Sequence, residues 1–241
     1  YYNSINVEVS GLEIRNHGLK LHALGSDRST SVFVSNAPTR VARFYVMESV
    51  IDALSHSQLK HQIGDHSFED VYFSTGGQLT PGQFDTILSI IDLLNKTPNW
   101  QLCLSFDNDL SGYQYDLQFV KQLTSAYFPM TSAPTDDKGI TFRLPHKSQY
   151  NTLQIALLEG IDRFNRQAVN TMIPQNSSTI HREPITIDYN SLYIQICLPP
   201  DCTSIAFFNK QILIITGLHQ RILIHKSLSK DFNQDLPNVQ L

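Results

Sequence analysis

Long apolar runs, positive charge and cysteine are all scarce in this sequence of 241 residues. The longest apolar stretches, such as residues 212–215, are far too short to cross a membrane, and the first residues have neither the basic nor the apolar region of a signal peptide. We therefore expect a soluble protein with no membrane partner. Because the chain does not begin with Met, we also expect it to be a piece of a longer protein.

Cysteine is too rare to build a disulfide framework. The chain has three, Cys103, Cys197 and Cys202, and no further Cys or His stands at zinc-ribbon spacing from the last two. An odd count suits a reducing compartment, so we predict a cytoplasmic protein. We interpret the three residues as small hydrophobic side chains of the interior.

Positive charge is in short supply, and the net charge of −4 argues against a nucleic-acid partner. The distribution of charge weakens that argument. Residues 41–130 contain four Lys and Arg against ten Asp and Glu, whereas the segments on either side are close to balance. Such a concentration of carboxylates is either solvated surface or a cation site, and local motifs have to decide between the two.

From Val41 onward, segments of strand length alternate with helical segments. We predict strands at residues 41–47, 70–74, 100–106 and 140–144. Helices are predicted to begin at Ser49, at Thr80-Pro81 and near Tyr113, the first two with capping-box spacing to Asp52 and Gln83. In the first helix, the apolar residues Val50, Ile51 and Leu54 fall on one side. This alternation predicts an α/β fold, a Rossmann-like, mostly parallel sheet with helices on both faces.

The flanking segments have a different character. Residues 1–40 read as an extension of short strands and turns, with alternating patches at 5–9 and 31–34. After a helix at 150–164, β-branched and aromatic residues dominate and predict strands at 185–187, 192–196, 205–208, 212–216 and 222–224, with hairpin turns at 209–210 and 217–218. We therefore divide the chain into an extension (1–40), an α/β domain (41–145) and a helix followed by a β-rich, mostly antiparallel C-terminal subdomain (146–241).

Polar residues follow three of the predicted parallel strands. They are Glu48, the turn Thr75-Gly76-Gly77, and the pair Asp107 and Asp109. In parallel sheets, ligands bind beyond the carboxyl ends of the strands, so these residues should meet in space. Two carboxylates as close as Asp107 and Asp109 repel each other unless a cation lies between them, and hard oxygen ligands suit Mg²⁺ or Mn²⁺.

Each of these features also has a plainer interpretation. The Asp107-x-Asp109 pattern is typical of loops in which one Asp caps the following helix. Asp52 shares a helix face with Glu48 if the helix begins early enough, and otherwise it forms a capping box with Ser49. The mildly basic C-terminal region is either a strand-borne phosphate-contact patch or a solvated face; it contains His219, Arg221, His225, Lys226 and Lys230.

Taken in order, the three motifs resemble those of the toprim family. Residues 47–54 are similar to its first motif, a Glu after an apolar strand with an Asp four residues later. Residues 74–80 are similar to its Gly-containing turn followed by Thr, and residues 106–112 to its D-x-D turn followed by a small residue and Gly. The resemblance covers about residues 41–145. It is closest to bacterial primases and to primase-like proteins of plasmids and conjugative elements.

The resemblance implies Mg²⁺-dependent (or Mn²⁺-dependent) phosphoryl or nucleotidyl transfer on nucleic acid, in DNA replication or mobile-element transfer. It gives Glu48 the role of general acid/base or metal support, and gives Asp107 and Asp109 the role of metal ligands. Asp52 and the turn Thr75, Gly76 and Gly77 are lesser candidates. The expected partners are single-stranded DNA, nucleotides, and other domains or proteins of the same machinery.

Departures from the family pattern leave alternatives open. A replicative primase has a zinc ribbon and an upstream basic subdomain, and neither is evident in this sequence. The same carboxylates would serve a toprim nuclease. The absence of an evident basic subdomain to hold nucleic acid favours a non-catalytic DNA-binding or docking module of a larger mobilisation protein. An unrelated α/β fold with a fortuitous D-x-D is the remaining interpretation.

Overall fold

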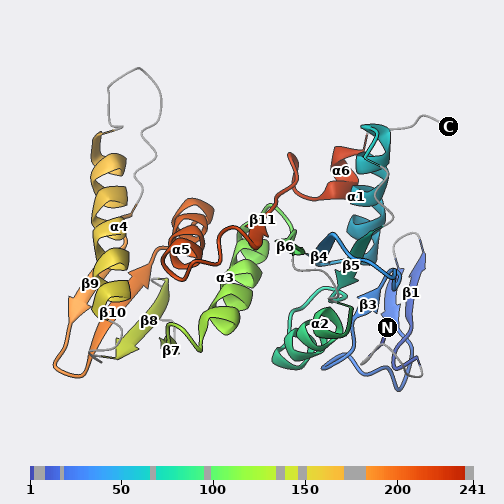
Figure 1. The fold of residues 1–241 in the computed structure, drawn as a ribbon, viewed down its shortest axis with the longest axis horizontal. Coiled ribbons are helices and arrows are strands. Elements are labelled where there is room, and N and C mark those ends of the chain that lie inside the picture. The colour runs from blue at the N-terminus through green and yellow to red at the C-terminus, as the bar shows by residue number, and fades with distance from the viewer. Residues whose placement is uncertain are drawn as a thin grey trace. The chain divides into compact units, whose positions relative to one another are not determined.

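The computed structural model describes residues 1–2, 9–16, 19–65, 69–94, 99–133, 139–145, 151–170 and 183–236. The chain forms two compact units, the first made of Tyr1–Tyr115 and Gln220–Leu241 and the second of Asp116–His219 (Figure 1). These units do not coincide with the division at residues 40 and 145 expected from the sequence. The difference arises because the chain leaves the first unit inside a helix and returns to it after His219.

A five-stranded sheet forms the centre of the first unit, with the strand order β11-β6-β4-β5-β3. The strands β4 (Arg43–Met47), β5 (Asp70–Ser74), β6 (Gln101–Leu104) and β11 (Ile222–Ile224) are parallel, and β3 (Phe33–Val34) pairs antiparallel with β5. A separate antiparallel pair consists of β1 (Glu13–Asn16) and β2 (Leu19–His22). The predicted parallel sheet is therefore confirmed, and both flanking segments of the chain add a strand to it.

Two helices of the first unit begin where the sequence predicts, whereas a third begins at Leu110 rather than near Tyr113 and a short fourth was not predicted. Helix α1 (Val50–Gln62) is capped by Ser49, whose hydroxyl accepts a hydrogen bond from the Asp52 amide at 3.2 Å. Helix α2 (Pro81–Leu94) is capped in the same way by Thr80, which accepts from the Gln83 amide at 3.2 Å. Helix α3 (Leu110–Thr124) begins in the first unit and continues into the second, and the short helix α6 (Phe232–Asp235) packs against α1.

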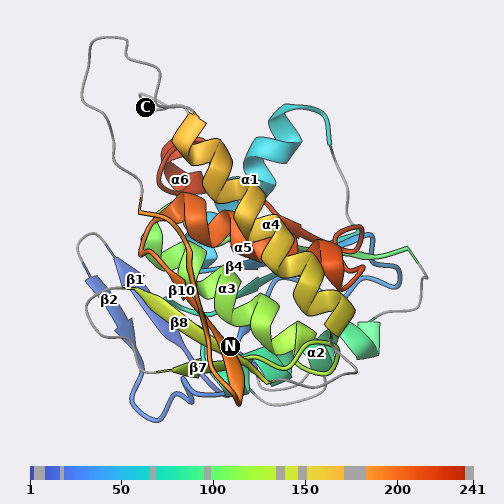
Figure 2. The same ribbon diagram turned by 90° about the vertical axis from the view of Figure 1, so that its left-hand side faces the viewer.

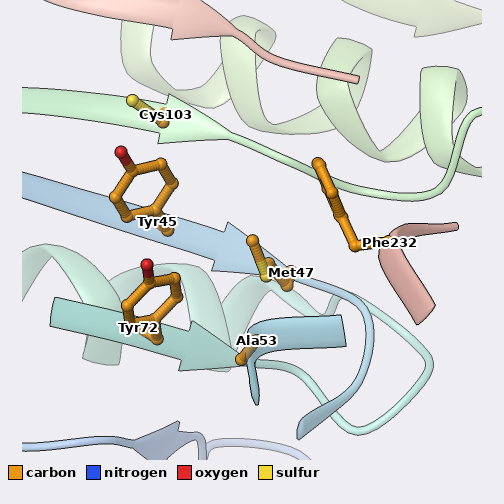
Figure 3. Close-up of a cluster of buried hydrophobic side chains, with 6 residues drawn as sticks. All are labelled: Tyr45, Met47, Ala53, Tyr72, Cys103 and Phe232. Atoms are coloured by element: carbon orange, nitrogen blue, oxygen red, sulfur yellow. The ribbon is translucent and has the colours of Figure 1, made fainter. Parts of the chain in front are cut away.

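Both faces of the parallel sheet are buried. Side chains alternate along each strand, and one set forms a cluster with Ala53 of α1 and Phe232 of α6 (Figure 3). Helix α2 lies on the other side of the sheet from α1 (Figure 1). The side chains of the second set are all fully buried: Phe44, Val46, Val71, Phe73, Leu102 and Leu104. Burial on both faces explains why these strands are mostly apolar, with their polar residues at the strand ends.

Helix α1 does not bury the side that its apolar residues suggest. Ile51 and Leu54 are 38% and 63% exposed, whereas Asp52, Ala53 and His56 are buried. The sheet beneath α1 presents tyrosine hydroxyls as well as apolar groups, and polar helix residues bond to them. His56 Nδ1, for example, lies 3.2 Å from the Tyr72 hydroxyl.

The second unit is a four-stranded antiparallel sheet with the order β7-β8-β10-β9 and two accompanying helices (Figure 2). Its strands are β7 (Thr131–Ala133), β8 (Ile140–Pro145), β9 (Thr186–Tyr189) and β10 (Tyr193–Leu198). Its helices α4 (Asn151–Asn170) and α5 (Cys202–Ile215) pack against each other. The expected antiparallel, β-rich C-terminal region is thus confirmed in part, and the strand predicted at 140–144 belongs to this sheet.

The prediction of strands at 205–208 and 212–216, joined by a turn at 209–210, is wrong. These residues form α5, whose buried side chains Ile205, Phe208 and Ile212 recur at helical spacing. Asp201 caps the helix by accepting a hydrogen bond from the Ser204 amide at 2.8 Å. The density of β-branched and aromatic residues indicated strands, but the burial pattern and the cap favour a helix.

Three smaller predictions have mixed outcomes. Cys103, Cys197 and Cys202 are all free thiols, and only Cys103 is fully buried. Within the described ranges, no helix is both long and apolar enough to span a membrane. Most of the alternating patch at 5–9 lies outside the described residues.

Candidate functional site

The carboxyl ends of the three central strands are aligned at one edge of the sheet. Met47 pairs with Ser74 across β4 and β5, and Val46 pairs with Leu104 across β4 and β6. The alignment continues past the strand ends, because the Thr75 amide donates to the Met47 carbonyl at 3.1 Å and the Ser105 amide to the Val46 carbonyl at 2.8 Å. The structure therefore brings the segments that carry the predicted site residues to the same edge.

The glycine turn after β5 holds the backbone of Glu48. The Glu48 carbonyl accepts hydrogen bonds from the Ser74 hydroxyl at 3.2 Å and the Thr75 hydroxyl at 3.5 Å. Gly76 and Gly77 have φ angles of 75° and 122°, which side-chain-bearing residues rarely adopt. The Gly77 carbonyl in turn accepts from the Tyr115 hydroxyl at 3.1 Å, so the turn also contacts helix α3.

The D-x-D turn closes directly onto the first turn of α3. Asp109 caps this helix, since its Oδ1 accepts from the Gly112 amide at 3.0 Å, and its other oxygen, Oδ2, lies 3.5 Å from Lys230 Nζ. A Cβ atom at Gly112 would lie 2.0 Å from the Asp107 carbonyl oxygen, so only glycine fits there. The capping interpretation of the motif is thus confirmed. The cap leaves Oδ2 of Asp109 facing the Lys230 ammonium group.

Negative charge is concentrated around Asp107. Its pKa is raised to about 7, first by burial and then by neighbouring carboxylates, those of Glu48, Asp52, Asp109 and Asp231. The effect reaches Tyr115, whose pKa is raised by burial and by Glu48, Asp109 and Asp107. Carboxylates from both the first and the third motif therefore act on one another in the folded chain.

Asp52 forms the capping box with Ser49, because α1 begins at Val50 and Glu48 lies outside the helix. It is 7% exposed and accepts a hydrogen bond from the Ser49 hydroxyl, which makes it part of the helix cap. Burial raises its pKa, and its charge contributes to the raised pKa of Asp107. It is thus a structural residue that also adds to the negative charge of the site.

No sequence pattern indicated that Asp231 lies near the site. It caps α6 by accepting from the Gln234 amide at 2.8 Å, and its charge acts on both Asp107 and Asp52. Lys226 and Lys230, noted only as part of a basic region, reach the same turn; Lys226 Nζ donates to the Asp107 carbonyl at 3.1 Å. The pairing of β11 with β6 brings this segment here, and residue spacing does not reveal that pairing.

No three His, Cys, Asp or Glu side chains in the described part of the chain are placed so that they could jointly hold a metal ion. The chemistry of the donor set nevertheless fits a hard cation. Glu48, Asp107 and Asp109 offer carboxylate oxygens, which Mg²⁺ and Mn²⁺ prefer. Burial, and then repulsion from neighbouring carboxylates, raise the pKa of Asp107, and a bound cation would relieve the repulsion. The metal site itself stays a prediction.

Comparison with known proteins gives one match. Residues 45–139 match the family model described as Toprim-like, and this range contains all three motifs. Neither the search of curated proteins nor the search of solved structures found a match. Toprim domains generally act on nucleic acids and bind Mg²⁺ through acidic residues. The match confirms the resemblance found in the sequence and places the similarity at residues 45–139 of this chain.

Proposed function

We propose that this protein transfers phosphoryl or nucleotidyl groups on nucleic acid with the help of Mg²⁺ or Mn²⁺, and that Glu48, Asp107 and Asp109 form its active site. The observation that carries the proposal is that β4, β5 and β6 end at one edge of the sheet, where the segments of Glu48, Asp107 and Asp109 follow them. At this edge burial, and then the neighbouring carboxylates, raise the pKa of Asp107. The toprim-like match of residues 45–139 supports the same assignment.

The proposed roles follow from the surroundings of each side chain. Asp107 is half-buried among like charges, so it is the residue whose charge a cation would stabilise most. Asp109 uses Oδ1 to cap α3 and would offer Oδ2. Glu48, whose backbone is fixed by Ser74 and Thr75, would support the cation or act as general acid/base. The cation would neutralise the phosphate and stabilise the attacking and leaving oxygens.

The proposed reaction is primase-like: on a single-stranded template, the terminal hydroxyl of the growing strand attacks the α-phosphate of a nucleoside triphosphate, and pyrophosphate leaves. The resemblance of residues 47–54, 74–80 and 106–112 to primase-like proteins supports this direction. Hydrolysis of phosphodiesters would use the same carboxylates, and a non-catalytic module would keep them without turnover. Products distinguish the three cases.

The test incubates the protein with single-stranded DNA, labelled nucleoside triphosphates, and Mg²⁺ or Mn²⁺. Elongated labelled products would support nucleotidyl transfer, and they should disappear in Glu48→Gln and in Asp107→Asn. Asp85→Asn is the matched control, because Asp85 is an exposed carboxylate on α2. Shortened DNA would instead show a nuclease. Intact DNA under every condition, with binding retained, would contradict catalysis and support a docking module.

A further inference from the structure

The segment after β11 reaches the D-x-D turn, although it lies outside the toprim-like match. Strand β11 is parallel to β6, with Ile224 opposite Leu104, so the two chains leave the sheet at the same edge. The pairing extends one residue further, because the His225 amide donates to the Leu104 carbonyl at 2.9 Å. Residues 226–231 therefore run beside Phe106 and the residues that follow it.

Several hydrogen bonds attach this segment to the turn. The Asn108 amide donates to the Lys230 carbonyl at 2.6 Å, and the Asn108 side chain donates to the Ser227 carbonyl at 3.0 Å. From the other side, Lys226 Nζ donates to the carbonyls of Phe106 and Asp107 at 3.0 and 3.1 Å. The middle residue of the D-x-D motif is thus the attachment point for the C-terminal segment.

The segment has its own internal structure. The Asp235 carboxylate accepts hydrogen bonds from the amides of Leu228 and Ser229 at 2.8 and 2.7 Å, and the Ser227 hydroxyl donates to the Ser229 carbonyl at 2.9 Å. These bonds fix the backbone from which the Lys230 side chain extends. Lys230 is therefore held at the site by backbone contacts that do not involve its ammonium group.

The two lysines differ in how their ammonium groups are used. Lys226 Nζ bonds two backbone carbonyls and lies 4.5 Å from the centre of the Tyr113 ring, which makes it part of the scaffold. Lys230 Nζ lies 3.5 Å from Asp109 Oδ2, and its side chain is 56% exposed. Such exposed ion pairs contribute little free energy and exchange readily.

We propose that Lys230 contacts a phosphate of the nucleic-acid substrate when a metal ion replaces it as the partner of Asp109. This inference rests on the proposed function. The oxygen that Lys230 faces, Asp109 Oδ2, is the one left over from the helix cap, so it is the oxygen a cation would take. With a cation bound there, the carboxylate of Asp109 would no longer attract Lys230 as strongly. The ammonium group, on its long stem and fixed backbone, would then be able to contact a substrate phosphate.

The experiment compares the wild-type chain with Lys230→Gln, Lys230→Arg and Arg40→Gln. Arg40 is the matched control, an exposed cation paired with Glu69 at 3.8 Å, and it precedes the amino end of β4, opposite to Glu48. Mg²⁺ binding is measured by calorimetry without nucleic acid. Binding of a labelled single-stranded DNA oligonucleotide is measured by fluorescence anisotropy in Mg²⁺ without nucleoside triphosphates, at several salt concentrations.

For Lys230→Gln we expect Mg²⁺ affinity to be unchanged or up to about fivefold higher, because a weak competing ion pair is gone. DNA affinity should fall by about tenfold, the effect of losing one charge-assisted hydrogen bond. The slope of log affinity against log salt should shrink by about 0.7, the value for one phosphate contact with a single strand. Lys230→Arg should restore the slope, and Arg40→Gln should behave as the wild type.

Two results would overturn the inference and leave the proposed function standing. One is a Lys230→Gln variant with wild-type DNA affinity and salt slope. The other is a Lys230→Gln variant that loses Mg²⁺ binding, since Lys230 would then shape the turn rather than contact the substrate. A wild-type chain that binds neither Mg²⁺ nor DNA would remove the proposed function, and this inference with it.

Discussion

Acidification should destabilise the first compact unit through one buried imidazole, that of His56. The side chain is 4% exposed, and its Nδ1 lies 3.2 Å from the Tyr72 hydroxyl. The rings of Tyr45, Phe232 and His225 lie 4.6, 4.8 and 5.1 Å from its own. Burial, the largest cause, lowers the pKa of His56 to about 3.

The charged groups around His56 partly oppose one another. His225, Lys60 and Arg43 act in the same direction as burial and lower the pKa of His56, whereas Asp65 raises it. The pKa of His225 is itself lowered, by burial and by Lys60. The folded chain therefore keeps His56 neutral under conditions in which the unfolded chain protonates it.

The sign and size of the effect follow from these two states. A folded pKa below the unfolded value gives stability that is present above about pH 6.5 and is lost as the pH falls from there toward about 3. Between about pH 7 and about pH 5, the loss from His56 amounts to about 2 kcal/mol. Over this interval the loss depends on the unfolded pKa alone, because the folded imidazole stays neutral at both pH values.

Urea unfolding at the two pH values measures this loss. Trp100 is the single tryptophan and belongs to the first unit, so its fluorescence reports that unit. We expect His56→Asn to be less stable than the wild type at pH 7, but to lose about 2 kcal/mol less on acidification. His61→Asn, on the exposed side of the same helix, is the control.

Two carboxylates work in the opposite direction. The raised pKa values of Asp52 and Asp107 mean that the folded chain gains stability as the pH falls through their range. Their contribution is present in the wild type and in both variants, so it cancels in the comparison. Equal losses in the wild type and His56→Asn would refute the reasoning, because His56 would then not be held neutral by the fold.

Two further substitutions test the D-x-D turn. Gly112→Ala should lower the free energy of unfolding by about 1–3 kcal/mol, despite the better helix propensity of Ala, because its Cβ would lie 2.0 Å from the Asp107 carbonyl oxygen. Thermal unfolding measures the effect, with the exposed Ser111→Ala as the control. Equal stability of the two variants would count against the close contact. Asp107→Asn should raise the melting temperature of the metal-free protein at about pH 8, because the substitution removes a half-buried charge that lies among like charges. Asp85→Asn, the control, should not raise it. A lower melting temperature for Asp107→Asn than for the wild type would contradict the charge cluster.

The convergence of the motifs could be predicted from the sequence because it depends on local patterns. Apolar segments of strand length ended at Met47, at Ser74 and close to Leu104, and parallel strands share one carboxyl edge. The caps Ser49 and Thr80 followed from residue spacing alone. The backbone role of Gly112 was not predicted, since it depends on a single close contact.

Other features depend on contacts between distant segments. Strand β11 joins β6 from more than a hundred residues further along the chain, and this pairing brings Lys226, Lys230 and Asp231 to the site. No local pattern encodes that pairing. The buried polar side of α1 was missed for a related reason, since His56 is buried against residues of other elements, among them Tyr72 of β5.

Magnesium binding tests the central claim most directly. Calorimetry compares the wild-type chain with the double variant Asp107→Asn, Asp109→Asn. Asn caps a helix as well as Asp does, so α3 should begin at the same residue in both proteins. The account predicts that the wild type binds Mg²⁺ and that the double variant does not. Equal binding by both proteins would contradict it, because the cation would then bind away from the carboxylates around Asp107.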